Sequence, residues 1–459
     1  MVIFQFLFII VTLAVFGMAA RQAGKIYRNI NLGKQDYTAD DNFGTRLKNM
    51  TLVALGQQKM FARPLAAVLH LFIYVAFIIT QIELIEIFVD GFFGTHRFFL
   101  PYLGRFYWFV ISFIEFLSVL AGVATVAFLA RRFYLKLPRF QNAELRGFPM
   151  FDAALILGLE AILITCIFTM NSTDLALQHR GAEGFHHTGG FLVSQFVAPI
   201  WDVLGFSNGA LMILERFGWW GHYLGVMAFI VWLPFSKHLH IVLAFFNTYY
   251  APLKSRGAME NMPVVQHEVE TMMAEMMGTP APEGAPMPEN YKFGASDVFD
   301  LSWKNLMDAY TCTECGRCTS VCPANTTGKL LSPRKIMMDV RDRMEEVGAN
   351  LDDQNLDFVR KEKRKADLVL TPENYDDGRS LFDFITTEEL RACTTCNACV
   401  EACPVMISPL DIIMELRRNQ ILEKSESPEA WNVMFSNIDN NRAPWQFSQD
   451  DRDKWTQEV

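Results

Sequence analysis

The chain carries one cysteine pattern twice, as Cys312-Thr-Glu-Cys315-Gly-Arg-Cys318-Thr-Ser-Val-Cys322-Pro323 and as Cys393-Thr-Thr-Cys396-Asn-Ala-Cys399-Val-Glu-Ala-Cys403-Pro404. These runs hold eight of the nine cysteines. Their spacing is typical of paired 4Fe–4S clusters, in which the fourth cysteine of each run binds the other cluster. The sequence therefore predicts two clusters that need both runs. Their ligands are Cys312, Cys315, Cys318 and Cys403 for the first cluster, and Cys393, Cys396, Cys399 and Cys322 for the second.

Two simpler interpretations of the cysteines fit less well. Structural zinc sites close with four ligands in two separated pairs, whereas each run here has four cysteines and ends in Cys-Pro. Disulfides would need an oxidising compartment, which the topology below excludes. The ligand spacing thus favours iron–sulfur clusters.

Hydrophobic residues are concentrated in the first half. The 459-residue chain is 51% hydrophobic and has a formal net charge of −9, but stretches long enough to cross a bilayer all lie before Phe246. We predict an all-α protein with five transmembrane helices followed by a soluble α-helical domain. The predicted spans are Val2–Ala20, Leu65–Val89, Phe106–Leu129, Phe151–Met170 and Gly221–Phe246.

Loop charges predict the orientation. The loops after the first and third spans are rich in Lys and Arg, whereas the two opposite loops hold only Arg97 and Arg105, then Arg180 and Arg216. Because basic loops face the cytoplasm, we expect the N-terminus outside and the cysteine domain in the cytoplasm of a bacterial or archaeal cell. No basic residue precedes the first span, so a cleavable signal peptide is not expected.

Composition also suggests domain boundaries. We predict a membrane domain at 1–250, a Pro- and Met-rich linker at 251–296, a two-cluster domain at 297–424 and a tail at 425–459. The linker holds a helical candidate at Val265–Met277 and then a proline-rich stretch that favours extended geometry. The sequence leaves open whether the soluble domain pivots on this linker or is held at a fixed distance.

The cysteine domain is expected to be helical rather than a compact βαβ ferredoxin, because 81 residues separate the starts of the two runs. Ser332-Pro333 and Ser408-Pro409 each predict a helix start, with serine as the N-cap and proline in the first turn. The charged stretch Arg360–Asp367 is interpreted as a solvated helix face, with partner docking as the alternative.

Histidines in the spans suggest a second cofactor. His70 lies near the cytoplasmic end of the second span, and His240 approaches the same surface from the fifth. Two facing histidines can hold a b-type haem, so we predict that this pair is its ligand set. His222 is 18 residues before His240, which on one straight helix puts both on one face about 27 Å apart. His238 would then face elsewhere.

A second haem on His222 is left open. Its partner should lie near the outer end of the second span, where Thr80 and Gln81 stand instead of a histidine. A ligand from the outer loops would have to be His96, His186 or His187.

At this point the residues support a resemblance to a known family. Leu233-Pro-Phe-Ser-Lys-His-Leu-His240 resembles the last helix of the dihaem cytochrome b (gamma) subunit of respiratory nitrate reductase and of heterodisulfide reductase-type complexes. Two further segments resemble the heterodisulfide reductase iron–sulfur subunit, namely Tyr310-Thr-Cys-Thr-Glu-Cys-Gly-Arg-Cys-Thr-Ser-Val-Cys-Pro323 and Leu331-Ser-Pro-Arg-Lys335. The tail Asp439-Asn-Asn-Arg-Ala-Pro-Trp445 is similar to larger proteins of that group.

The resemblance implies an electron-transfer subunit of a respiratory chain, with b haem, two clusters and quinone as substrate. Counting from His70, the family's second histidine position is Thr80, which puts the outer haem in doubt. Larger members also carry Cys-Cys-Gly repeats for a catalytic cluster, and this chain has none. We therefore expect the soluble substrate to be handled by a partner, either a Cys-Cys-Gly subunit or an electron-transfer flavoprotein. The sequence contains no nucleotide-binding glycine motif, and no nucleic-acid partner is expected.

For the quinone site, the candidates are His222 together with Glu83 or Glu86, whose carboxylates could exchange protons; the alternative is that both glutamates simply reach the interface. Two other functions stay open. The bundle could be a haem-free anchor, or the chain could belong to an ion-translocating pump. The mid-span Glu115 and Glu160 would serve the pump as proton relays, although hydrogen bonding to polar neighbours is the simpler interpretation.

Overall fold

The computed structural model describes residues 2–35, 37, 41–255, 257–259, 261–284, 287–288, 291–359 and 368–457. The described residues are overwhelmingly helical, and their β-structure is limited to an isolated bridge between Lys34 and Ser302. The predicted all-α class is confirmed. The charged stretch Arg360–Asp367 lies outside the described residues.

Four helices are long and apolar enough to span a membrane. They begin close to the predicted spans but extend further, mostly at their C-terminal ends. Their bounds are α1 (Val2–Ile30), α3 (Pro64–Phe93), α5 (Arg105–Leu129) and α6 (Phe148–His179). Many of their large apolar side chains are exposed in the isolated chain, as expected of helices that face lipid.

The predicted fifth span is broken. Helix α8 (Asn208–Trp232) is followed by two 3-10 turns, η6 (Leu233–Phe235) and η7 (Lys237–Leu239), and then by α9 (His240–Tyr249), with a bend of 92°. Pro234 explains the break, because its ring removes a backbone donor and clashes with the preceding turn. The number of candidate spans is therefore four, or five if this bent pair is one span.

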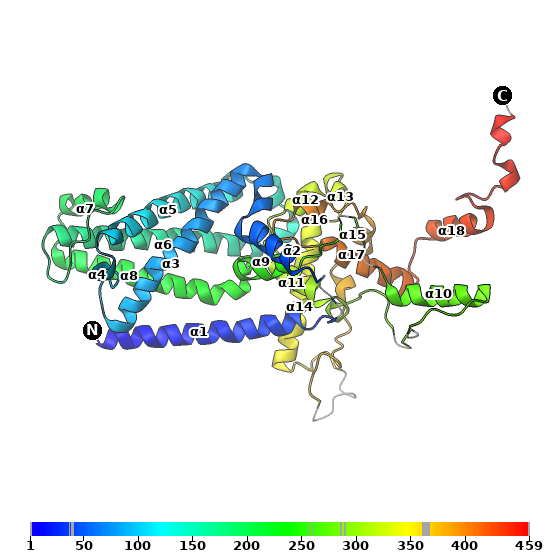
Figure 1. Ribbon diagram of the computed structural model, residues 1–459, viewed down its shortest axis with the longest axis horizontal. Coiled ribbons are helices and arrows are strands. Elements are labelled where there is room, and N and C mark those ends of the chain that lie inside the picture. Colours follow the sequence, from blue (N-terminus) through cyan, green and yellow to red (C-terminus); the bar gives the residue numbers. More distant parts are fainter. Residues whose placement is uncertain are drawn as a thin grey trace.

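The long helices form an elongated bundle with the soluble domain at one end (Figure 1). Helix α6 packs along α8, and α3 packs along α5. We call the end that contacts the soluble domain the inner end, and the end that carries α7 (Ser194–Val203) the outer end. Short elements complete the bundle: α2 (Phe43–Asn49), η1 (Met50–Leu55), η2 (Gln58–Ala62), α4 (Leu100–Leu103), η3 (Ala130–Tyr134), η4 (Pro138–Phe140) and η5 (Ala143–Leu145).

The soluble half is built from two similar series of helices. Ser332 caps α14 by accepting from the Lys335 amide, and Ser408 caps α17 by accepting from the Asp411 amide, as predicted. The elements are η8 (Val298–Asp300), α11 (Trp303–Thr311), α12 (Arg317–Val321), α13 (Pro323–Thr326), α14 (Pro333–Asp353), η10 (Leu381–Asp383), α15 (Thr387–Arg391), α16 (Ala398–Ala402), α17 (Pro409–Arg418) and η11 (Asn419–Glu423).

The soluble half is docked directly on the bundle. Ile26 and Leu32 from the end of α1, and Leu239 and Ala244 from the broken helix, belong to the same hydrophobic core as the soluble helices. Arg334 of α14 is fully buried and donates to the Arg139 carbonyl, 2.7 Å away, in the loop between α5 and α6. These contacts hold the two halves in one arrangement without relying on the linker.

The linker and the tail extend away from this body (Figure 1). The linker contains α10 (Pro263–Met277), which confirms the predicted helix. The tail contains α18 (Glu429–Asn441) and two short turns, η12 (Gln449–Asp451) and η13 (Lys454–Thr456). The domain boundaries at 250, 296 and 424 stay predictions.

Candidate functional site: cysteines, histidines and a buried carboxylate

The structure brings the cysteines together in the predicted combinations across the two runs. Burial raises the pKa of the Cys318 thiol well above its usual range, and the nearby Cys315, Cys312 and Cys403 raise it further. Burial also raises the pKa of Cys403 to about 11, with Cys315 as its next contributor. Cys403, the last cysteine of the second run, therefore lies with the first three cysteines of the first run.

The second group of thiols combines the first three cysteines of the second run with the last cysteine of the first run. Burial raises the pKa of Cys399 to about 12, and Cys393, Cys322 and Cys396 add to the shift. Cys322 thus lies with the cysteines of the other run. Clustered thiols with raised pKa values become stable thiolates when a positive centre binds them, as metal ligands must be deprotonated.

The backbone repeats as well. Glu314 and Thr395, each two residues after the first cysteine of a run, have φ values of 52° and 55°. Gly316 and Asn397, each directly after the second cysteine, have φ values of 68° and 61°. These left-handed residues turn each run around its own group of thiols.

Among the residues that the structure describes, no group of three or more His, Cys, Asp or Glu side chains is arranged to hold one metal ion. In a cubane each cysteine binds a different iron at a corner of the cluster, so its four ligands surround a larger volume than those of a single ion.

The histidines gather at the inner end. The ring centroids of His70 and His240 lie 6.4 Å apart, which brings together the predicted pair. The Nδ1 atoms have hydrogen-bond partners: Gln57 Oε1 for His70 at 3.0 Å and the Lys237 carbonyl for His240 at 2.9 Å. Such bonds fix the orientation of a ring and leave Nε2 as the atom for a ligand.

Two expectations about the neighbouring histidines are wrong. His238 lies beside the pair, with its centroid 5.9 Å from that of His240, because η7 is a tight turn rather than a continuation of α8. His222 and His240 do not share the face of one straight helix, because the break at Pro234 separates them. His222 is buried on α8, where its Nδ1 lies 3.3 Å from the Leu163 carbonyl.

The first cysteine run lies against this histidine group. Arg317, between Cys315 and Cys318, donates to the Met60 carbonyl at 3.3 Å, in the turn just before α3. Glu314 forms an ion pair with Lys237, which is three residues before His240. The second run reaches α9 through Asn247, which donates to the Val405 carbonyl at 2.9 Å.

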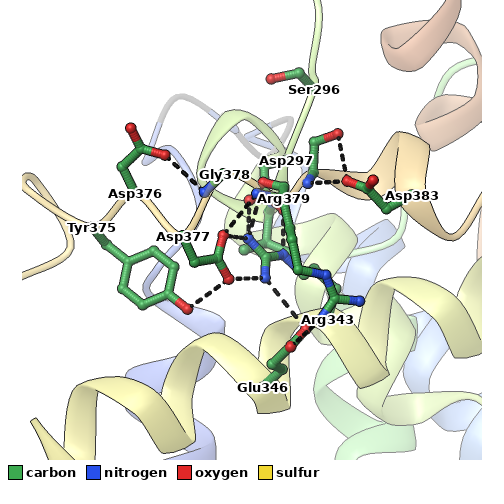
Figure 2. Close-up of polar contacts among 12 residues, drawn as sticks. Ser296, Asp297, Arg343, Glu346, Tyr375, Asp376, Asp377, Gly378, Arg379 and Asp383 are labelled. Carbon is green, nitrogen blue, oxygen red and sulfur yellow. Dashed lines mark hydrogen bonds and ion pairs between the residues drawn. The ribbon is translucent and has the colours of Figure 1, made fainter. Parts of the chain in front are cut away.

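A second buried charge network holds the soluble domain itself together (Figure 2). The Arg343 side chain of α14 is fully buried and forms ion pairs with Asp297 at 2.7 Å and Asp377 at 2.6 Å. Tyr375 donates to Asp377 at 2.9 Å. This network fixes the segment around 375–383, which lies between the two cysteine runs in sequence.

The outer end contains a cluster of carboxylates around Arg97. Glu83 is 2% exposed, and neither of its side-chain oxygens has a hydrogen-bond partner among the described residues. The nearest charge partner is the Arg97 guanidinium at 3.8 Å. Glu83 lines a cavity of about 10 Å³, with space for about one water molecule. The cavity is also lined by Glu86, Ile87, Asp90, His96, Arg97, Met170, Glu215 and Trp219.

The other sequence candidates near this end have specific partners. Glu86 is 3% exposed and accepts from the Tyr107 hydroxyl at 2.7 Å and from the Phe99 amide at 2.9 Å. Both glutamates are therefore held inside the bundle. Glu115 accepts from the Val193 and Ser194 amides at the start of α7, which supports the simpler interpretation of that residue. His222 is absent from the cavity lining.

Three residues that organise these sites were not predicted from the sequence. Arg97 was counted only as a loop charge, and Lys237 and Glu314 were quoted only as parts of motifs. Their positions in the sequence could have indicated these roles. Glu314 lies inside a cysteine run, and Lys237 lies between Pro234, which breaks the last helix, and His240.

Comparisons with known proteins agree with the cysteine geometry. Residues 311–407 match the family model of the 4Fe–4S dicluster domain. This match, with the two thiol groups, supports bound iron–sulfur clusters. No solved structure gave a significant match.

Curated relatives extend the similarity beyond that domain. The chain is 25% identical over 94% of its length to the "Probable iron-sulfur-binding oxidoreductase FadF" of Bacillus subtilis (strain 168), of which it covers 57%. It is 25% identical over 93% of its length to the "EtfAB:quinone oxidoreductase" of Syntrophomonas wolfei, of which it covers 56%. A "Probable membrane-anchored ferredoxin" of Chromohalobacter salexigens is 31% identical over 36% of this chain and is covered to 24%. The chain thus spans little more than half the length of the first two relatives.

Proposed function

We propose that this protein is an oxidoreductase subunit that transfers electrons between a membrane quinone and a cytoplasmic redox partner. The electrons would pass through a b-type haem at the inner end of the bundle and through two 4Fe–4S clusters. One observation carries the proposal: the His70–His240 pair lies beside the part of the chain that contacts the first cysteine run, because Lys237, three residues before His240, forms an ion pair with Glu314 of that run. This contact would bring the haem close to the first cluster, as one-electron transfer between them requires.

The histidine pair has the spacing that a bound iron needs. Two metal–nitrogen bonds of about 2 Å, with roughly 1 Å from each nitrogen to its ring centre, give a centroid separation of about 6 Å. The distance of 6.4 Å agrees with this value. His70 and His240 would hold the haem, which supplies a one-electron centre within the membrane. Gln57 and the Lys237 carbonyl would orient the two rings.

Cysteines from both runs would hold the clusters. Cys312, Cys315, Cys318 and Cys403 would bind the cluster nearer the bundle, and Cys393, Cys396, Cys399 and Cys322 would bind the other. Cys396 is the only exposed residue among these eight described thiols. The second group therefore offers the side from which a soluble partner exchanges electrons.

At the outer end, Glu83 is the best candidate for proton exchange with a quinol. Quinol oxidation releases two electrons and two protons, and a carboxylate without hydrogen-bond partners beside a water-sized cavity can accept a proton. Glu86 accepts hydrogen bonds from Tyr107 and the Phe99 amide, so it would position the carboxylate cluster rather than exchange protons directly. The partnership of His222 with Glu83 remains a proposal, as does a second haem on His222.

The partner proposal draws on the relatives. One relative is an EtfAB:quinone oxidoreductase, which favours an electron-transfer flavoprotein over a Cys-Cys-Gly subunit as the soluble partner. We propose that the soluble domain faces the cytoplasm and that the N-terminus faces out, in agreement with the basic loops after the first and third spans.

A reduced-minus-oxidised optical spectrum of the purified protein tests the proposal, with a quinol analogue as the sole reductant. We expect a b-haem band that quinol elicits and that His70→Ala removes, while the iron and sulfide contents stay unchanged. A spectrum with only broad iron–sulfur bleaching would contradict the haem assignment and would support a membrane anchor instead. His267→Ala serves as the control, because that histidine lies on α10 of the linker and should leave the haem band intact.

A further inference from the structure

Two arginines of α14, separated by a single residue, serve different buried networks. Arg343 pairs with Asp297 and Asp377 within the soluble domain (Figure 2). Arg341 pairs with Glu314 at 2.9 Å, and Glu314 in turn pairs with Lys237 of the membrane half. Only the second network connects the histidine pair to a cysteine run.

We propose that the Lys237–Glu314 pair is an electrostatic element that tunes the two neighbouring redox centres in opposite directions. Glu314 would lower the reduction potential of the cluster on the first run, and Lys237 would raise the potential of the histidine-bound centre. The pair thereby favours the electron on the histidine side. This inference rests on the proposed function, and both residues are positioning residues that act through their charges.

The placement of each charge supports this assignment. Glu314 lies between Cys312 and Cys315, and its left-handed backbone holds it inside the turn that surrounds the thiols. The backbone of Lys237 lies beside the histidine pair, because its carbonyl accepts the hydrogen bond from His240 Nδ1, 2.9 Å away. The ammonium group also contacts the Pro149 carbonyl at 2.8 Å.

Burial makes these charges effective. The side chains of Lys237 and Glu314 are 7% and 3% exposed, so solvent screens them weakly. Other charges face the pair: Asp152 lies 3.7 Å from Lys237, and Arg341 lies on the far side of Glu314. Removing the Glu314 charge would uncover Arg341, which shifts the cluster potential in the same upward direction.

Shifts of opposite sign in the two reduction potentials distinguish this electrostatic role from a packing role. Glu314→Gln should raise the potential of the first cluster, because reduction no longer places an electron beside a buried anion. Lys237→Gln should lower the potential of the histidine-bound centre. The double variant Glu314→Gln/Lys237→Gln should leave the first cluster above, and the histidine-bound centre below, its wild-type potential. Both shifts should be smaller than in the single variants, because the removed cation and anion partly offset each other at each centre.

Redox titration of the purified full-length protein, followed by optical absorbance for haem and by EPR for the clusters, tests the inference. The second cluster is an internal reference that should not move. Asp377→Asn is the matched control, since it removes one buried carboxylate from an α14 arginine on the network of Figure 2 and should leave every potential unchanged.

The outcomes separate this inference from the proposed function. If no haem is bound, the proposed function fails, but the upward shift of the first cluster in Glu314→Gln still supports the role of Glu314. Unchanged potentials in both single variants, or equal shifts in Glu314→Gln and Asp377→Asn, would overturn the inference. If the unpaired charges in the single variants prevent folding, the charge-balanced double variant and the charge-conserving Glu314→Asp provide the comparison. Because Glu314→Asp keeps the negative charge, both centres should then keep their wild-type reduction potentials. A shift in Glu314→Asp as large as the shift expected for Glu314→Gln would count against the inference.

Discussion

The two cysteine runs share their spacing and their left-handed positions but have different surroundings. The first run contacts the membrane half through the buried side chains of Arg317 and Glu314. The second run contacts it through the more exposed Glu401, which pairs with Lys59 at 3.8 Å, and it also carries the exposed Cys396. In the proposed electron path, the first run would therefore face the bundle and the second run would face a soluble partner.

A single pair of equivalent residues shows how the difference is built. Gly316 and Asn397 follow the second cysteine of their runs, and both have positive φ. A Cβ atom on Gly316 would lie 2.5 Å from the Arg334 guanidinium and 3.2 Å from the Arg139 carbonyl. The first run needs glycine there because the bundle approaches it closely, whereas asparagine is tolerated at the equivalent position of the second run.

The largest expected effect comes from breaking the exchange of cysteines between the runs. Cys403→Ser should remove the cluster of the first run, and Cys322→Ser should remove that of the second, because each fourth cysteine lies with the other run's thiols. Iron analysis should show about half of the wild-type content in each variant if one cluster survives alone. The exchange would be contradicted if EPR showed that each variant loses the cluster bound by the first three cysteines of the run that carries the substitution.

Exchanging the two equivalent residues should have unequal effects. Gly316→Asn should destabilise the docked state by about 1–3 kcal/mol through overpacking against Arg334, whereas Asn397→Gly should cost less than about 1 kcal/mol. Thermal unfolding in detergent and limited proteolysis of the linker measure this difference. Equal stability losses would mean that the first run is not held against the bundle.

Acidification should weaken the contact beside the first run. Burial alone would raise the pKa of Glu144, but its hydrogen bond and charge interaction with Arg334 lower it below the ordinary value. The stabilisation is therefore fully present above the ordinary glutamate pKa of about 4.3 and is lost as the pH falls through the lowered value. We expect faster proteolysis of the loop between α5 and α6, which carries Glu144, below about pH 4, measured with an acid-active protease.

Glu144→Gln supplies the control for that pH dependence. In this variant the rate of proteolysis should rise less at low pH than in the wild type. The rate at pH 7 should change only moderately, because the Ser332 and Arg334 hydrogen bonds can persist with an amide oxygen. If proteolysis of Glu144→Gln increases at low pH as much as proteolysis of the wild type, the effect comes from other carboxylates.

The smallest expected effect concerns solvent access. Because Cys396 is exposed and Cys312 is buried, a hydrophilic oxidant should bleach the second cluster before the first. EPR samples frozen during oxidation would show the order. Simultaneous loss of both signals at every time point would show that the two runs are equally accessible.

Much of this architecture could be predicted from local sequence. The Ser-Pro helix starts and the cysteine runs of the dicluster domain depend on nearby residues, and the helical class was predicted correctly from them. Four of the five predicted spans correspond to long apolar helices. The proximity of His70 and His240 was also predicted, whereas their role as haem ligands stays a prediction. The break of the last helix was missed, although Pro234 was a visible signal that a straight helix from His222 to His240 would be interrupted.

The remaining features depend on contacts between distant parts of the chain. The sequence does not indicate that Arg334 is fully buried against Arg139, nor that Glu314 pairs with Lys237, because isolated charged residues usually face solvent. The unpartnered state of Glu83 likewise arises from the packing of several helices around it. Such sites are recognised only once the helices are assembled.

The most direct test of the electron path is quinol reduction of the clusters in His240→Ala, followed by EPR. The variant should contain both clusters and should reduce them with dithionite, but a quinol analogue should no longer reduce them, whereas it reduces them in the wild type. Cluster reduction by quinol at the wild-type rate in His240→Ala would show that electrons reach the cysteine runs without the inner histidine pair, and would contradict the proposed path.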